Sequence, residues 1–276
     1  MHGLRALGIT VMAVLASQGF QLLVAGSFLL VRPTDLAEAV ARVSTHPLSL
    51  ALAQLLGFGV VLRLSARWMA RRGARPRPAL GLGTPPAFDV LALCLVAGLA
   101  LQLPLAEIGN AVQELAPLSL EAELRRQRLV EPGGLGGALM ALFAFVVVAP
   151  ATEELLFRGL ILPGLEARHG TAVGLVGSAL LFGAIHFDWP GFGSAAVAGL
   201  VLGAIRIRTG SLWPCLVAHA GVNAVPLLVP RSVWAIEGFN LPRAGVDHVP
   251  LAVLLPSLAV GALALALLER RASPRG

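Results

Sequence analysis

Apolar stretches long enough to cross a bilayer recur along the whole chain and restrict what it can fold into. A membrane-spanning helix needs about 20 mostly apolar residues, with a range of about 17–25. Eight stretches reach or approach this length: Leu7–Val31, Leu48–Leu64, Phe88–Glu107, Leu135–Leu162, Thr171–Phe187, Phe192–Ile207, Leu212–Val229 and Val249–Leu268. We therefore predict an all-α polytopic membrane protein with about eight transmembrane helices.

The composition excludes other classes of protein. Of the 276 residues, 57% are hydrophobic and only 13% are charged, whereas a soluble domain carries about 25% charged residues and under about 50% apolar ones. The same values exclude a disordered chain. Cys94 and Cys215 both lie inside apolar runs, so no disulfide framework is expected. We interpret residues 1–276 as one integral membrane domain in a lipid bilayer.

The positive charge predicts an orientation rather than a nucleic-acid partner. The net charge is +6, and all 21 basic residues other than histidine are arginines. Cytoplasmic loops of membrane proteins are rich in such residues, and six of them crowd the connection between the second and third stretches: Arg63, Arg67, Arg71, Arg72, Arg75 and Arg77. This connection and both termini are therefore predicted to be cytoplasmic. The mixed segment Pro117–Glu131 is expected on the outer side as an amphipathic helix.

A few polar residues lie inside the predicted spans, where ionisable side chains are costly and therefore mark functional sites. Glu153 and Glu154 lie in the fourth stretch, His186 in the fifth, and His219 and Asn223 in the seventh. With a rise of about 1.5 Å per residue, four of these residues would lie about 12–22 Å from the cytoplasmic helix ends. We expect them to form one cluster nearer the cytoplasmic side, with a substrate reached from the cytosol or inner leaflet.

The spacing of these residues indicates what each side chain could do. Glu154 and Arg158 are four residues apart and can form an intrahelical ion pair. That pairing leaves Glu153 available as a general base toward water. His219 and Asn223 share one helical face and could donate hydrogen bonds to an oxyanion.

These segments resemble the CAAX protease and bacteriocin-processing family of intramembrane endopeptidases, also called the Abi family. Three signatures carry the resemblance: two glutamates followed by an arginine, a phenylalanine four residues before a histidine, and a histidine four residues before an asparagine. They occur in the family's order as Glu153, Glu154 and Arg158, then Phe182 and His186, then His219 and Asn223. The resemblance covers about residues 135–229, which we interpret as the protease core.

The resemblance implies an eight-helix intramembrane endopeptidase with a glutamate-centred site. It implies that Glu153 activates water together with His186, that His219 and Asn223 stabilise the oxyanion, and that Arg158 holds Glu154. Phe182 is expected to pack in the core beneath the histidine. Glu153, His186 and His219 are also a plausible zinc set, but they lack the His-Glu-x-x-His spacing of common zinc proteases. We therefore favour a mechanism without a metal.

The substrate and two other functions stay open at this point. The eukaryotic branch of the family cleaves prenylated carboxy-terminal tails, but the lysine-free composition is typical of a GC-rich bacterial genome, where protein prenylation is not expected. We predict a membrane-associated peptide or protein substrate and a location in a bacterial inner membrane. A non-catalytic scaffold or immunity protein on the same fold is one alternative. A proton-coupled transporter is another, although such transporters usually contain repeated halves.

Overall fold

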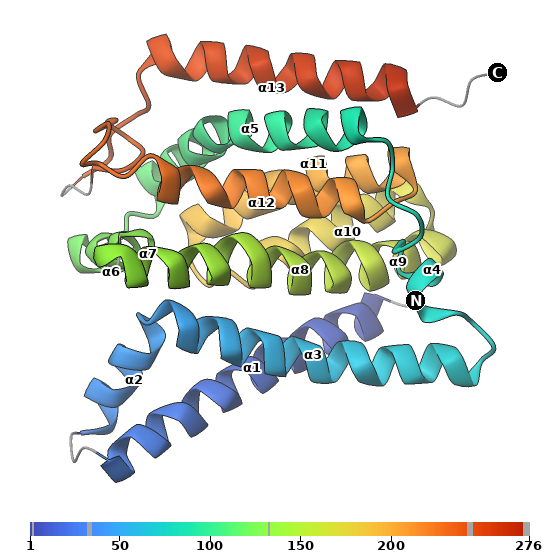
Figure 1. The fold of residues 1–276 in the computed structure, drawn as a ribbon, viewed down its shortest axis with the longest axis horizontal. Helices are drawn as coiled ribbons and strands as arrows, with labels where there is room; N and C mark the ends of the chain where they lie inside the picture. Colours follow the sequence, from blue (N-terminus) through green and yellow to red (C-terminus); the bar gives the residue numbers. More distant parts are fainter. Residues whose placement is uncertain (2, 32–34, 132, 242–244, 273–276) are drawn as a thin grey trace.

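All regular structure in the part of the chain that is described is helical, with no β-strand (Figure 1). The structure is a computed structural model that describes residues 1, 3–31, 35–131, 133–241 and 245–272. The first half contains α1 (Gly3–Val31), α2 (Leu36–Ser44), α3 (Pro47–Arg71), α4 (Pro76–Ala79), α5 (Phe88–Leu115) and α6 (Leu120–Val130). The second half contains α7 (Gly134–Ala141), η1 (Leu142–Val148), α8 (Ala149–Glu154), η2 (Leu155–Ile161), α9 (Leu162–His169), α10 (Thr171–Ala184), α11 (Trp189–Thr209), α12 (Trp213–Leu228) and α13 (Leu251–Ala272).

The predicted all-α membrane architecture is confirmed, while the number of spans stays a prediction. Among the described residues, six helical segments are long and apolar enough to cross a membrane: Gly3–Ser27, Pro47–Arg71, Phe88–Leu115, Gly134–His169, Trp189–Thr209 and Leu251–Arg271. The fifth and seventh predicted spans correspond to α10 and α12, which are apolar but have only 14 and 16 residues. Both fall below the usual length of a spanning helix.

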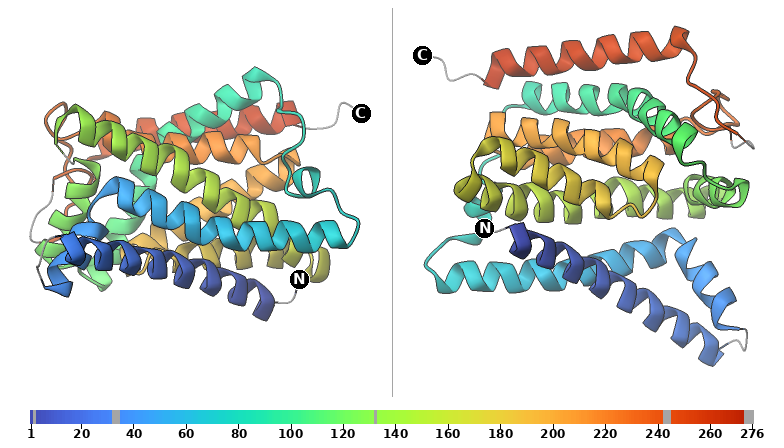
Figure 2. Two further views of the ribbon diagram at one scale, coloured as in Figure 1. Left: turned by 60° about the horizontal axis from the view of Figure 1, so that its bottom comes forward. Right: turned by 180° about the vertical axis from the view of Figure 1, so that it is seen from behind.

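The helices lie side by side in a fixed order across the bundle. The helix α13 packs on α5, which in turn packs on α11 and α12, and α1 packs on α3. Figures 1 and 2 show α13 at one edge of the bundle and the pair α1 and α3 at the opposite edge. The amino end of α1, the carboxyl end of α13 and the short helix α4 lie at one end of the bundle, and α6 lies at the other (Figure 1).

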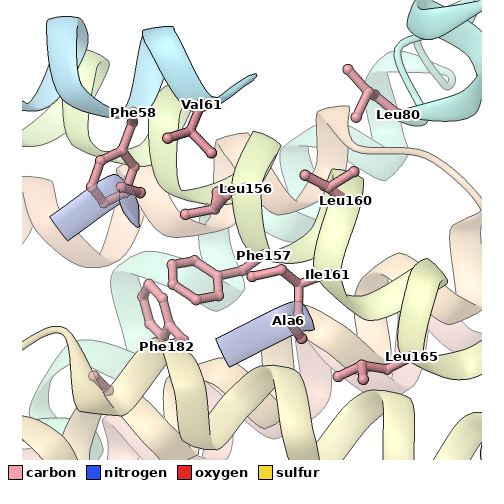
Figure 3. Packing of buried hydrophobic residues seen from close by; sticks show 12 residues of the cluster. Ala6, Phe58, Val61, Leu80, Leu156, Phe157, Leu160, Ile161, Leu165 and Phe182 are labelled. Carbon is pink, nitrogen blue, oxygen red and sulfur yellow. The ribbon is translucent and has the colours of Figure 1, made fainter. Parts of the chain in front are cut away.

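The largest cluster of buried apolar residues surrounds the segment that follows Glu154. Leu156, Phe157 and Ile161 are 0% exposed, and Phe182 from α10 is 2% exposed. Figure 3 shows the rings of Phe157 and Phe182 beside each other, with centroids 5.3 Å apart in an edge-to-face arrangement. Leucines on the outer faces of the long helices are exposed instead, as a lipid-facing surface requires.

One glycine determines how closely α5 approaches α12. A Cβ atom at Gly98 would lie only 2.0 Å from the backbone oxygen of Ala218. Only glycine lets the two backbones come this close, as in other membrane helix pairs. This contact positions the turn of α12 that contains His219.

The fourth predicted span is one long helix with two wider, π-helical segments. The segments η1 and η2 each end two residues before a proline, Pro150 and Pro163. A proline ring clashes with the carbonyl of residue i−4 in an α-helix, and here those residues, Val146 and Gly159, lie inside the π-helical segments. The wider turns relieve this clash, and π-helical turns are frequent at functional sites.

A histidine attaches the connection between α12 and α13 to the carboxyl end of α5. His248 Nδ1 lies 2.6 Å from Glu107 Oε1, and its Nε2 lies 3.0 Å from Glu114 Oε1. Because ionised carboxylates only accept hydrogen bonds, both ring nitrogens must carry protons to make the two contacts. The hydrogen bonds to Glu107 and Glu114 raise the pKa of His248 above its ordinary value.

Candidate active site

The predicted ion pair between Glu154 and Arg158 is present and entirely buried. Arg158 Nη1 lies 2.7 Å from Glu154 Oε1, and both side chains are 0% exposed. Arg158 Nη2 also donates to the carbonyl of Gly199 on α11 at 3.1 Å. A buried pair of this kind is costly to break because one charge would be left uncompensated.

Phe182 packs at the centre of the polar cluster, as the sequence analysis expected of a core residue. The guanidinium carbon of Arg158 lies 4.4 Å from the centroid of the Phe182 ring. The rings of His186 and His219 lie 5.3 and 5.6 Å from the same ring, both edge to face. One aromatic side chain therefore contacts the guanidinium and both histidines.

Glu154 also determines the orientation of His219. His219 Nδ1 lies 2.8 Å from Glu154 Oε1, the oxygen that also accepts from Arg158. The acceptor is a carboxylate, so Nδ1 carries a proton, and Nε2 then points toward Glu153 Oε2 at 3.7 Å. His219 therefore lies between the two carboxylates, hydrogen-bonded to Glu154 and facing Glu153.

Glu153 receives a hydrogen bond from a residue outside the three signatures. Gln54 Nε2, on α3, donates to Glu153 Oε1 at 2.8 Å, and Glu153 is 8% exposed. Gln54 was not among the predicted site residues, although a glutamine inside the second predicted span is a polar signal visible in the sequence. Its partner, 99 positions away, could not be inferred from spacing within one helix.

His186 lies just beyond its helix rather than on it. The helix α10 ends at Ala184, so the prediction that the fifth helix contains this histidine is wrong by two residues. His186 Nδ1 lies 3.0 Å from the carbonyl oxygen of Phe182. Because a carbonyl only accepts, Nδ1 carries the proton and Nε2 of the neutral ring is left as an acceptor.

Asn223 is held by the π-helical segment that precedes the two glutamates. Its Nδ2 donates to the carbonyl oxygen of Phe145 at 2.8 Å, and Phe145 lies within η1. A primary amide has two N–H groups, so one donor remains after this bond. The residue lies one turn from His219 on α12, as the four-residue spacing predicted.

The structure distributes the predicted site residues over two cavities. A cavity of about 340 Å³ is lined by Phe182, His186, His219 and Asn223, together with residues of α5, α6 and α11. Glu153 instead lines a second cavity of about 130 Å³ with residues of α1 and α3. The contact between His219 Nε2 and Glu153 Oε2, at 3.7 Å, links the two sides.

The larger cavity extends away from the arginine-rich connection. Its lining continues along α5 to Gln113 and along α6 to Gln127, and α6 lies at the end of the bundle opposite α4 (Figure 1). The expectation of access from the arginine-rich end does not hold for this cavity. Depth along a helix places a side chain between two ends, but it does not say at which end the helices separate.

The donor atoms of Glu153, His186 and His219 do not form a metal site as they are arranged. Within the ranges that the structure describes, no three His, Cys, Asp or Glu side chains could hold a metal ion together. His219 Nδ1 is bonded to Glu154 and His186 Nδ1 to a carbonyl. The first histidine points its other nitrogen to Glu153, while the second lines only the larger cavity.

A comparison with known protein families matches the segment that contains this site. Residues 135–225 match the family model described as "Type II CAAX prenyl endopeptidase Rce1-like". The match covers about a third of the chain, and over this segment the chain is similar to the CAAX protease family. The matched range contains all three signatures, and the family implies protease activity and a multi-pass membrane protein.

Similarity to a curated protein extends beyond the CAAX protease segment. An "uncharacterized 24.3 kDa protein" of Escherichia coli is 28% identical over 167 residues, which are 57% of this chain and 71% of the relative. No solved structure matches the chain significantly.

Proposed function

We propose that this protein is an intramembrane endopeptidase that hydrolyses a peptide bond in a membrane-associated peptide or protein. The observation that carries this proposal is the buried carboxylate of Glu153, held between Gln54 Nε2 at 2.8 Å and His219 Nε2 at 3.7 Å. An ionisable group at this depth is costly to retain without a use. Its place inside a CAAX protease segment supports a hydrolytic use.

In the proposed reaction, Glu153 acts as the general base. Its carboxylate takes a proton from water while the water oxygen bonds to the scissile carbonyl carbon. His186 Nε2 is the proposed second acceptor that orients this water, since Nδ1 is committed to the Phe182 carbonyl. The carbonyl electron pair moves onto oxygen and gives a tetrahedral oxyanion.

The proposed oxyanion donors are on α12. With Nδ1 bonded to Glu154, a protonated His219 can donate from Nε2, and Asn223 retains one amide N–H. Donors aimed at the developing negative charge stabilise the transition state. The C–N bond then breaks, Glu153 returns its proton to the leaving nitrogen, and the products are a carboxylic acid and an amine, so that one water is consumed.

We propose that this reaction proceeds without a metal, because one ring nitrogen of each histidine is bonded within the protein and the remaining donor atoms do not converge on one point. The roles of Glu154 and Arg158 are then positional: the ion pair holds the carboxylate that orients His219. We further propose that the enzyme lies in a bacterial inner membrane with both termini cytoplasmic. The larger cavity then faces the outer side.

The lining of the larger cavity supports a polypeptide substrate. Gln102, Asn110, Gln113 and Gln127 line it between the histidines and α6. Carboxamides can both donate to and accept from a peptide backbone. The matched family is named for prenyl endopeptidases, and apolar side chains such as Leu105 and Leu202 line the same cavity, so the polar groups suit a peptide backbone and the apolar ones suit its side chains.

The test is cleavage of a library of membrane peptides by the purified protein and by Glu153→Gln, each with and without a chelator. Cleavage by the wild type that survives chelation and is lost in Glu153→Gln supports the proposal. Cleavage lost with chelator and restored by zinc would contradict the metal-free mechanism. Equal cleavage by both forms would contradict the role of Glu153, and a physiological phenotype retained by Glu153→Gln would favour a scaffold.

A further inference from the structure

The cavity on the Glu153 side of the site has a polar interior in an otherwise apolar region. It is lined by Val14, Ser17 and Gln18 of α1, Gln54 and Phe58 of α3, Glu153, and the neighbours of His186 in sequence, Ile185 and Phe187. Four of these eight side chains are polar. An empty cavity in a protein is ordinarily apolar, whereas polar walls hold water.

We propose that this cavity between α1, α3 and α8 is the water site of the enzyme and supplies the attacking water to Glu153. The inference rests on the proposed function. Substrate enters through the larger cavity lined by His186, His219 and Asn223, and water enters from the opposite side of the Glu153 carboxylate.

The size and the hydrogen-bonding groups both suit water. A volume of about 130 Å³ has room for a few water molecules, since each occupies roughly 30 Å³ in the liquid. Ordered water in proteins makes about three hydrogen bonds, and the carboxylate of Glu153, the Gln54 carboxamide and the Ser17 hydroxyl provide such partners. These polar groups favour water over an acyl chain in this space.

Two backbone features border the cavity: a close contact between α1 and α3, and a residue with a positive φ after α10. A Cβ atom at Gly57 would lie 2.3 Å from the backbone nitrogen of Ser17, so α1 and α3 are in direct backbone contact one turn beyond Gln54. On the other wall, Phe187 has a φ of 60° and is 71% exposed. A residue other than glycine rarely adopts this conformation, and strained residues cluster at functional sites.

Two phenylalanines provide an internal comparison for detecting the water. Phe58 is 4% exposed and lines the cavity, and Phe157 is 0% exposed and lies in the apolar core. Hydroxyl radicals generated by X-ray radiolysis label side chains next to bound water as well as those in bulk solvent. In protein reconstituted in lipid nanodiscs, we expect Phe58 to be labelled several-fold faster than Phe157. Equal labelling of the two rings would overturn the proposal.

A variant that fills the cavity tests whether this water is the one used. Val14→Phe adds a ring to the cavity wall, whereas Leu15→Phe adds the same ring to the adjacent position, which is 64% exposed on the outer face of α1. We expect Val14→Phe to abolish labelling of Phe58 and to slow cleavage of the peptide library at least about 10-fold, approaching the roughly 10²–10⁴-fold lost when general-base catalysis is removed entirely. Leu15→Phe should change neither, and continued protection of Phe157 shows that each variant is folded.

The outcomes separate this inference from the proposed function. Loss of Phe58 labelling in Val14→Phe with cleavage at the wild-type rate would overturn the water supply and leave the protease intact. Labelled Phe58 in a wild-type protein that cleaves no peptide would overturn the protease and, with it, the use of the water. If Val14→Phe loses both labelling and cleavage while Leu15→Phe keeps them, the water supply and the proposed protease function are both supported.

Discussion

Replacing Arg158 by methionine should destabilise the protein strongly, because it removes a buried charge and the hydrogen bonds of the guanidinium. The guanidinium is fully buried and bonds to Glu154 at 2.7 Å and to the Gly199 carbonyl at 3.1 Å. Methionine replaces the apolar stem of arginine but has neither the guanidinium nor its charge, so Glu154 would keep only His219 as a partner. Breaking a buried pair from one side costs about 3–5 kcal/mol, and we expect Arg158→Met to lose that much of the free energy of unfolding.

Removing both charges together should recover most of that loss. In the double variant Glu154→Leu with Arg158→Met no uncompensated charge remains, and such replacements are often close to neutral. His219 would still lose its acceptor, which costs about 1.5–3 kcal/mol for a hydrogen bond to a charged group. The double variant should therefore be more stable than Arg158→Met and yet fail to cleave, because His219 is no longer oriented.

The assay is unfolding by denaturant in detergent micelles, monitored by tryptophan fluorescence, together with peptide cleavage. A matched control is Arg125→Met on α6, which removes an exposed pair of the same four-residue spacing, with Glu121 at 3.3 Å. This control should lose under about 0.5 kcal/mol. A loss at Arg158→Met as small as at Arg125→Met, or a double variant that cleaves normally, would refute the reasoning.

Three further perturbations test other contacts. The contribution of His248 to the free energy of unfolding should be complete below about pH 6.5 and lost as the pH rises through its raised pKa. Denaturant unfolding between about pH 6 and pH 9 should show this loss in the wild type. The variant His248→Gln should not show it. Gln54→Met should slow cleavage about 10-fold or more, because it removes a hydrogen bond to the charged Glu153. The control is Gln18→Met, which changes a glutamine of the same cavity that is not bonded to Glu153. Equal cleavage rates for the two variants would contradict this prediction. Gly57→Ala should destabilise the protein by about 1–3 kcal/mol or more through overpacking. Gly59→Ala should have no such effect, because nothing lies within 4 Å of its Cβ position. Thermal unfolding of the two variants measures the difference.

The sequence predicted those features that depend on local pattern. Hydropathy and length identified the helical segments because a bilayer demands both, and the four-residue spacing placed Arg158 beside Glu154. The end of α10 before His186 could not be read from the sequence, because apolar composition continues to Phe187 while the helix ends at Ala184. Local patterns are least informative at such boundaries.

Features that depend on contacts between distant segments were missed for a physical reason. The bond from Gln54 to Glu153 joins two helices whose separation is decided by the backbone contact at Gly57. The same packing leaves Glu153 on a different cavity from His186. Periodicity within a single helix contains no information about which of its faces meets which neighbour.

The most direct test of the central claim is the turnover number of Glu153→Gln on a peptide that the wild type cleaves. The substitution keeps the shape of the side chain and removes the base, so the account predicts a loss of about 10²–10⁴-fold with an unchanged unfolding midpoint. Turnover within a few-fold of the wild type by a folded Glu153→Gln protein would contradict the account.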